Sequence, residues 1–139
     1  MLETKTSRFN TVKYMEKKSM TTITYRNEKH QSLFEKSIEK KNPNNYPLLS
    51  ALYLLTADYK LWNCTKKYIS KNKIVFDNIR LSGISITGYT LFCCAKDLYC
   101  GTKHLTIADI TDRNLITQKQ FELIHSAMII RRFGLEGLK

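Results

Sequence analysis

The chain has 139 residues, 42% of them hydrophobic, which suits one domain with a hydrophobic core of its own. Five Gly and two Pro are few, and this composition favours helices over a turn-rich β fold. The formal net charge of +11 bears on partners rather than on the fold, and it admits nucleic acid, a ribonucleoprotein, an acidic protein face or an anionic membrane surface.

Residues 1–6 contain no apolar run of the kind that a signal peptide needs. A chain that is not exported belongs in a reducing cytoplasm, where disulfides are rare. We therefore expect a cytoplasmic protein whose cysteines are free thiols. These cysteines are Cys64, Cys93, Cys94 and Cys100.

Residues 1–25 carry many basic and few acidic side chains and show no sustained hydrophobic period. They predict a basic leader, which is either a mobile basic arm or a disordered segment. Residues 21–25 have β-branched character, which favours a short extended piece. Residues 26–139 are expected to form a single helical domain.

A first helix is predicted over residues 27–41. Asn27 is a good N-cap, and Glu28 suits the positive end of the helix. A moderately apolar stripe marks its core face. That stripe contains His30, Leu33, Phe34, Ser37 and Ile38. Residues 42–45 (NPNN) then break the helix, since Asn and Pro favour turns.

Residues 46–57 form the stretch around which the rest of the chain is organised. At about 3.6 residues per turn, its apolar side chains point in nearly every direction, and such a helix must be covered on all sides. Pro47 fits the first helical position, where its missing N–H is no loss. The run is shorter than the roughly 20 residues that a bilayer span needs. We therefore expect the central helix of a core, without membrane contact.

Residues 59–76 combine five lysines and several aromatic rings with no acidic residue. We expect a helix to about Tyr68, then a loop with a short strand at residues 73–76. Residues 78–86 are expected to form an irregular connection. A further helix should begin after Ser85 or Thr87 and run to residue 100, where Gly101 stops it.

A short helical turn is predicted at residues 106–110, followed by a last helix. Thr117 and Gln120 have the spacing of a capping box, and the helix that they open runs to Phe133 and ends at Gly134. Arg131 falls within its apolar face, where it either snorkels outward or pairs with an acid. The candidate acids are Asp97, Asp109 and Asp112.

The sum of these elements is an all-α protein. We predict a compact bundle of about five helices around a central apolar helix, preceded by a basic N-terminal leader.

Four stretches carry a family resemblance. They are residues 28–34 (EKHQSLF), 52–62 (LYLLTADYKLW), 91–101 (LFCCAKDLYCG) and 121–133 (FELIHSAMIIRRF). Together they resemble an uncharacterised family of small proteins carried by Gram-positive bacteria, their phages and other mobile elements. The resemblance covers about residues 25–134 and implies a helical fold and no established catalytic activity. By analogy, it also implies a small inhibitor of a host nuclease complex, such as an anti-CRISPR protein.

Cys93, Cys94, Cys100 and His104 form the one cluster of zinc-type ligands along the chain. Cys93 and Cys100 are seven residues apart, about 10 Å along one helix, so a single ion cannot bind both while that helix is intact. Cys94 faces the core as a small hydrophobe. Only Cys100 with His104, across the helix end, remains as a metal-binding pair. We expect no metal and no cofactor.

No catalytic constellation is evident. A cysteine nucleophile needs a histidine oriented by a third group, and His104 and His125 show no recognised arrangement of that kind. Asp97, Asp109 and Asp112 are interpreted as caps, turns and ion-pair partners. There is no glycine-rich phosphate loop, and the chain is therefore expected not to be an enzyme.

Residues 59–76 are the best candidate for a binding site. Lysines neutralise phosphates, and exposed aromatic rings stack on unpaired bases. The opposing interpretation makes Trp62 and Phe76 core residues and leaves only a lysine-rich solvated face. The candidate site residues are Lys60, Lys66, Lys67, Tyr68, Lys71 and Lys73.

The sequence therefore favours a non-enzymatic basic protein that engages nucleic acid or a nucleic-acid-processing ribonucleoprotein, as an inhibitor of the anti-CRISPR type. The alternative is a protein–protein adaptor whose charge serves only steering and solubility.

Overall fold

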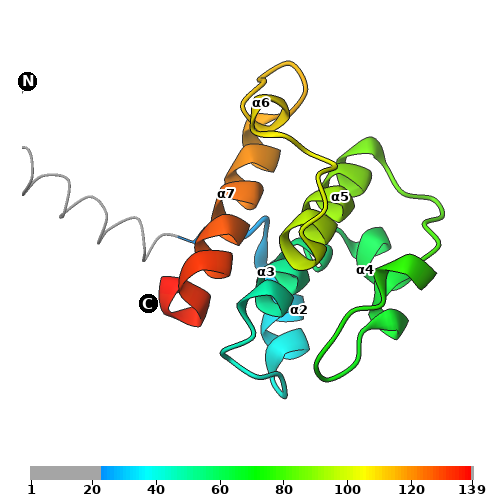
Figure 1. Ribbon diagram of the computed structural model, residues 1–139, viewed down its shortest axis with the longest axis vertical. Helices are drawn as coiled ribbons and strands as arrows, with labels where there is room; N and C mark the ends of the chain where they lie inside the picture. The colour runs from blue at the N-terminus through cyan, green and yellow to red at the C-terminus, as the bar shows by residue number, and fades with distance from the viewer. Residues whose placement is uncertain (1–22, 139) are drawn as a thin grey trace, which may run out of the picture.

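The computed structural model describes residues 23–138, which form six α-helices and three short 3₁₀ helices (Figure 1). The α-helices are α2 (Glu28–Ile38), α3 (Tyr46–Leu55), α4 (Tyr59–Thr65), α5 (Ile86–Cys100), α6 (Ile107–Ile110) and α7 (Gln118–Phe133). The 3₁₀ helices are η1 (Lys66–Tyr68), η2 (Phe76–Asn78) and η3 (Gly134–Leu138). The all-α prediction is confirmed, and no strand forms among the described residues.

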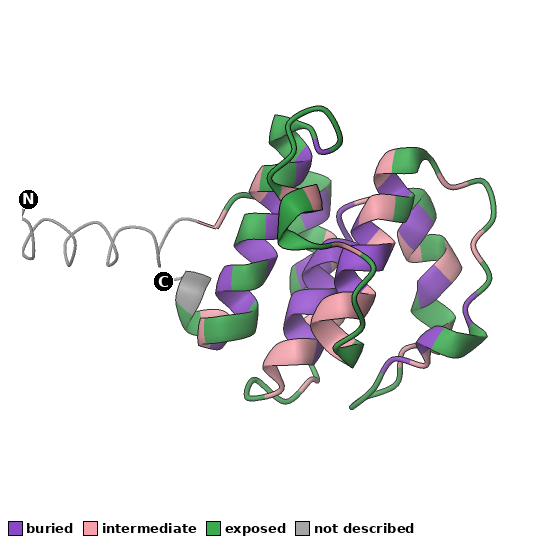
Figure 2. Ribbon diagram, turned by 45° about the horizontal axis from the view of Figure 1, so that its top comes forward, coloured by how far each residue is buried: buried purple, intermediate pink, exposed green. Residues whose placement is uncertain are grey.

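The helix α3 lies at the centre of the structure, as its composition predicted. Every side chain from Leu48 to Leu55 is buried, and Figure 2 shows this helix almost entirely in the buried colour. The helices α5 and α7 pack along it, and α2 and α4 also contact it. The hydroxyl of Ser50, buried with the leucines, donates to the carbonyl oxygen of Pro47 at 2.9 Å. A helix enclosed in this way is held by burial of apolar surface rather than by its own propensity.

Local signals set most of the helix ends. The side chains of Asn27, Asp58 and Ser85 each accept a backbone N–H at the start of α2, α4 and α5. Thr117 and Gln120 form both hydrogen bonds of the capping box that the sequence predicted for α7. Gly101 ends α5 with φ at +78°, a left-handed conformation that glycine adopts without steric cost.

The helical segment that the sequence predicted to about Tyr68 reaches that residue, as α4 followed directly by the 3₁₀ helix η1. Two details of the prediction are wrong. The first helix ends at Ile38 rather than near residue 41. Residues 73–76 form no strand, because their only β pairing is one bridge between Ile69 and Ile74 across a short loop. The sequence also missed the 3₁₀ helix η3, which folds back against α3 and α7.

Residues 23–25, assigned by the sequence to the leader, pack against the helices. Ile23 and Tyr25 are half-buried at the edge of the core. The backbone N–H of Thr24 donates to Ser126 Oγ on α7 at 3.1 Å. The Arg26 guanidinium donates to the carbonyl oxygen of Ala57 at 3.0 Å and lies 3.6 Å from the Asp58 carboxylate. The rest of the predicted leader, residues 1–22, lies outside the described residues.

None of the helices in residues 23–138 combines the length and the apolar character that crossing a bilayer requires.

Candidate nucleic-acid interface

The helix α4 and the turn after it present the first three candidate lysines. Asp58 caps α4 by accepting the N–H of Leu61 at 3.0 Å, and Leu61 and Thr65 turn one face of the helix into the core. That orientation leaves Lys60, Lys66 and Lys67 exposed. Their exposure thus follows from which side chains of this short amphipathic segment are buried.

Lys71 and Lys73 are exposed on the loop that follows η1. Backbone hydrogen bonds from Ser70 N–H to the Lys73 carbonyl and from Val75 N–H to the Tyr68 carbonyl close this loop. The Tyr99 hydroxyl on α5 accepts the N–H of Ile74 at 3.1 Å, which ties the loop to the helices. The two lysines therefore sit on an anchored part of the chain.

No acidic side chain among residues 23–138 lies within ion-pair distance of any of the five candidate lysines. The ion pairs of this part of the chain lie elsewhere, at Arg26–Asp58, Lys96–Asp77 and His104–Asp97. The charges of the five lysines are thus exposed, with no counter-charge beside them from residues 23–138. This arrangement leaves them able to meet an anionic partner.

The aromatic residues of the segment divide between the core and the surface. Phe76 is buried, with its ring centroid 5.5 Å from Phe92 and 5.6 Å from Tyr99. Tyr68 is half-buried against the core, and the Lys67 ammonium lies 5.3 Å from its ring centroid. Tyr59, which the sequence did not select, is 53% exposed. The opposing interpretation, which assigned Trp62 and Phe76 to the core, therefore holds for Phe76 and in part for Trp62, which is half-buried against the core.

Tertiary packing adds lysines that sequence reasoning missed. A groove of about 490 Å³ runs between α2 and α4, and Lys66 lines it together with Lys36 and Lys41 from α2 and the segment that follows. Lys29 lies at the same interface, with its ammonium 3.8 Å from the Tyr59 ring centroid. Lys29 and Lys36 are seven residues apart and share one helix face, which is the signal that the sequence offered.

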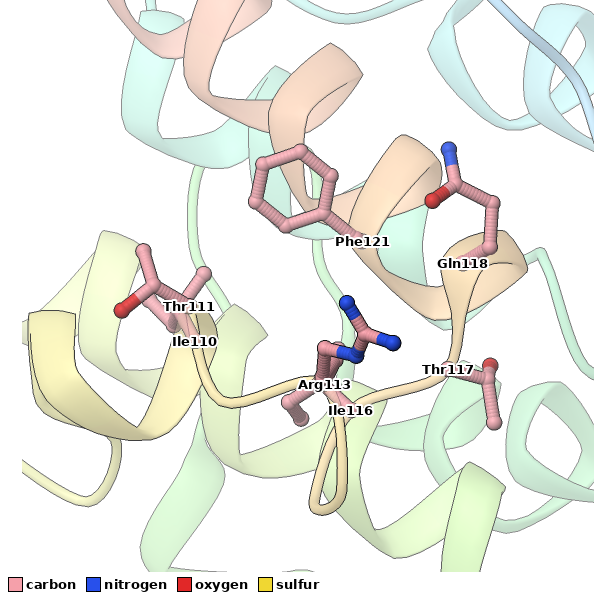
Figure 3. A pocket seen from close by; sticks show the side chains of 7 residues that line it. All are labelled: Ile110, Thr111, Arg113, Ile116, Thr117, Gln118 and Phe121. Carbon is pink, nitrogen blue, oxygen red and sulfur yellow. The ribbon is translucent and has the colours of Figure 1, made fainter.

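A second hollow, of about 440 Å³, lies between the end of α6 and the first turn of α7 (Figure 3). Phe121 and Gln118 project from α7, Thr111 follows α6, and Arg113 lies on the loop between them. Among the described residues, no His, Cys, Asp or Glu lines this hollow.

The thiols of Cys93, Cys94 and Cys100 are not poised for nucleophilic chemistry. Burial raises the pKa of the Cys94 thiol to about 12. Burial also raises the pKa of Cys93, against a hydrogen bond from Tyr89 that lowers it, and partial burial raises the pKa of Cys100. A raised pKa keeps a thiol protonated and weakly nucleophilic.

Asp97 organises the loop after α5. Its carboxylate accepts the Thr102 hydroxyl at 2.6 Å and the N–H groups of His104 and Leu105 at 2.9 and 2.7 Å. Burial acts to raise the pKa of Asp97, but these hydrogen bonds outweigh it and hold the pKa below its usual value. The carboxylate thus stabilises the loop after α5. This agrees with the interpretation of Asp97 as a turn residue.

Cys100 and His104 are the pair that the sequence left as candidate metal ligands, and no third ligand joins them among residues 23–138. His104 Nδ1 lies 2.9 Å from the Asp97 carboxylate, and Cys100 is exposed at the helix end. Within residues 23–138, no three His, Cys, Asp or Glu side chains converge as metal ligands.

Arg131 pairs with none of the three acids considered for it. Its side chain is exposed, and Nε donates to the carbonyl oxygen of Leu98 at 3.2 Å. The carbonyl belongs to the last turn of α5, where backbone oxygens lack helical partners and attract cations. The residue thus joins the surfaces of α7 and α5.

No protein-family model, curated protein or solved structure matches this chain. The resemblance of residues 25–134 to proteins of mobile elements therefore stays a prediction. Function has to be argued from the surface of the molecule.

Proposed function

We propose that this protein is a non-enzymatic binding protein that engages nucleic acid, or a ribonucleoprotein that processes it, through α4, η1 and the following loop. The observation that carries the proposal is the exposure of the five lysines, none of which has an ion-pair partner in the part of the chain that the structure describes. Lysines in this situation bind phosphates and release their counterions. The raised pKa values of Cys93, Cys94 and Cys100 and the structural role of Asp97 support a binding role over a catalytic one.

The geometry favours contact with the phosphate backbone over reading of a duplex sequence. The helix α4 has seven residues. The lysines exposed on it and on η1 are Lys60, Lys66 and Lys67, which as point charges position a nucleic acid rather than specify its bases. An inhibitor of a nuclease complex would need only such general contacts. The support for inhibition is the predicted family resemblance, and its measurement is the cleavage rate of a purified nuclease ribonucleoprotein with and without this protein.

A binding titration across a salt series tests the proposal. The logarithm of the binding constant should fall linearly with the logarithm of the salt concentration, because each lysine–phosphate contact releases a counterion. Replacing all five lysines by Glu should abolish binding. A salt-independent affinity would contradict the proposal.

A matched pair of variants separates the local surface from the total charge. The test variant carries Lys60→Glu, Lys67→Glu and Lys71→Glu, and its control carries Lys103→Glu, Lys119→Glu and Arg132→Glu. All six residues are exposed, and both variants lower the net charge equally. Only the test variant should lose most of its affinity.

The adaptor remains as a second candidate, favoured by apolar side chains on the outer face of α7. Phe121 and Met128, seven residues apart, are each 39% exposed. The His125 ring lies between them in sequence and stacks parallel to Phe121, with centroids 6.4 Å apart. A pulldown that survives nuclease treatment and high salt would favour this candidate over nucleic-acid binding.

A further inference from the structure

The groove between α2 and α4 carries the two kinds of side chain that a single-stranded nucleic acid requires. Lys36 and Lys41 line one side of it, and Lys66 lines the other. Tyr59 and Trp62 lie on the α4 side, one helical turn apart. The volume of about 490 Å³ falls within the range of about 300–1,000 Å³ that is common for small-molecule sites.

Three lysines give the groove a positive charge, and no Asp or Glu from residues 23–138 lines it. The acids of this segment lie on one side of the helix at intervals of seven and four residues, Glu28 and Glu35 within α2 and Glu39 at its C-cap. Lys29 and Lys36 lie on the neighbouring face, since one residue turns the helix by about 100°. The lysine face is the one directed toward α4.

The aromatic side chains are placed to receive a base. Tyr59 is 53% exposed. The Lys29 ammonium lies over its ring, 3.8 Å from the centroid, in a cation–π contact that restrains the ring. Trp62 is half-buried, and the apolar side chains of Leu33 and Ile69 lie beside it in the groove. Rings partly fixed in this manner stack on unpaired bases at little further entropic cost.

We propose that this groove is where the protein holds single-stranded nucleic acid, with a base stacked on Tyr59 and Trp62 and phosphates bound by Lys36, Lys41 and Lys66. The inference rests on the proposed function and names both the form of nucleic acid and its point of attachment. An acidic peptide would satisfy the lysines but would leave the aromatic rings without a stacking partner, so the rings favour nucleobases.

Trp62 is the single tryptophan of the chain, so its fluorescence reports directly on the groove. Titration of the full chain with a short thymidylate or uridylate oligonucleotide should quench this fluorescence. An abasic strand with the same number of phosphates should bind more weakly and leave the fluorescence unchanged.

Two variants with matched controls complete the test. Tyr59→Leu should weaken binding about tenfold through the loss of one stacking contact, whereas Tyr89→Leu should not. Tyr89 lies on α5 and, at 55%, is about as exposed as Tyr59. Lys36→Glu should weaken binding more than Lys103→Glu, which makes the same charge change on the exposed loop after α5.

The possible failures are distinguishable. One outcome is binding that leaves Trp62 fluorescence unchanged and is as tight for Tyr59→Leu as for the parent. It would contradict the groove as the binding site but not the proposed function. Quenching by the abasic strand or by polyglutamate equal to that by thymidylate would overturn base stacking. Absence of salt-dependent binding to any oligonucleotide would contradict the proposed function, and with it the proposal that the groove binds single-stranded nucleic acid.

Discussion

His30 Nε2 lies 2.7 Å from the carbonyl oxygen of Tyr53, at the buried contact between α2 and α3. On the other side of the ring, Nδ1 accepts the backbone N–H of Arg26 at 3.0 Å. Because Nδ1 is an acceptor, the proton of the neutral imidazole belongs on Nε2, which donates to Tyr53. Burial lowers the pKa of His30 to about 4, the Tyr53 carbonyl opposes this shift, and the Arg26 charge adds to it.

The stability of the protein should therefore fall as the pH is lowered from 6.5 towards 4. In that window the unfolded chain binds a proton at His30 and the folded chain does not, so protonation favours unfolding. The loss from this one residue is roughly 2 kcal/mol at pH 5. Urea unfolding at pH 7 and pH 5 measures it.

The same experiment on two histidine variants identifies the group responsible. His30→Phe should be less stable at pH 7, because it leaves the Tyr53 carbonyl without its donor, but it should lose less stability between pH 7 and pH 5. His125→Gln, at an exposed position, should keep the parent's pH dependence. An undiminished pH dependence in His30→Phe would assign the effect to another group.

Gly134 should not tolerate alanine. Its φ is +69°, and a Cβ at this position would overlap the ring of Tyr46. Gly83 has a similar φ of +70° but open space around it. Gly83→Ala should thus cost about 1–2 kcal/mol of backbone strain, and Gly134→Ala should cost at least roughly 2 kcal/mol more. Thermal or urea unfolding of both variants compares them, and equal losses would show that the Tyr46 ring moves aside freely.

Replacement of Asp97 by Asn should loosen the loop after α5. The amide offers one acceptor oxygen in place of two, so at least one of the hydrogen bonds from Thr102, His104 and Leu105 is lost, together with the charge. We expect a loss of roughly 2 kcal/mol near pH 7. Because the folded pKa of Asp97 is lowered, this contribution is present above pH 4 and disappears as the pH falls further. Asp77→Asn, whose parent side chain is 93% exposed, should change stability little in the same assay.

A single lysine of the proposed interface should have a measurable effect on salt dependence. Lys71→Ala is expected to reduce the slope of log K against log salt by up to about 0.7 for a single strand, with weaker binding to every sequence tested. The exposed side chain makes no ion pair within residues 23–138, so the fold should not change. Lys103→Ala is the control, and equal slopes in both variants would argue against a localised interface.

The sequence by itself determined the elements whose signals lie within three or four residues of one another. The apolar run of α3, the N-caps Asn27 and Ser85 and the capping box of Thr117 with Gln120 each formed as predicted. These features depend on hydrogen bonds and packing between near neighbours, so a linear sequence contains them in full.

Tertiary structure alone decided the contacts between distant residues. Thr24 is hydrogen-bonded to Ser126, and Arg131 donates to the Leu98 carbonyl rather than pairing with an acid. Lys36 of α2 lies across a groove from Trp62. The five candidate lysines could be chosen from the sequence because exposure follows from charge. The grouping of Lys66 with Lys36 and Lys41 could not, because it depends on how α2 and α4 both pack on α3, and helical periodicity gives the face of a helix but not its neighbour.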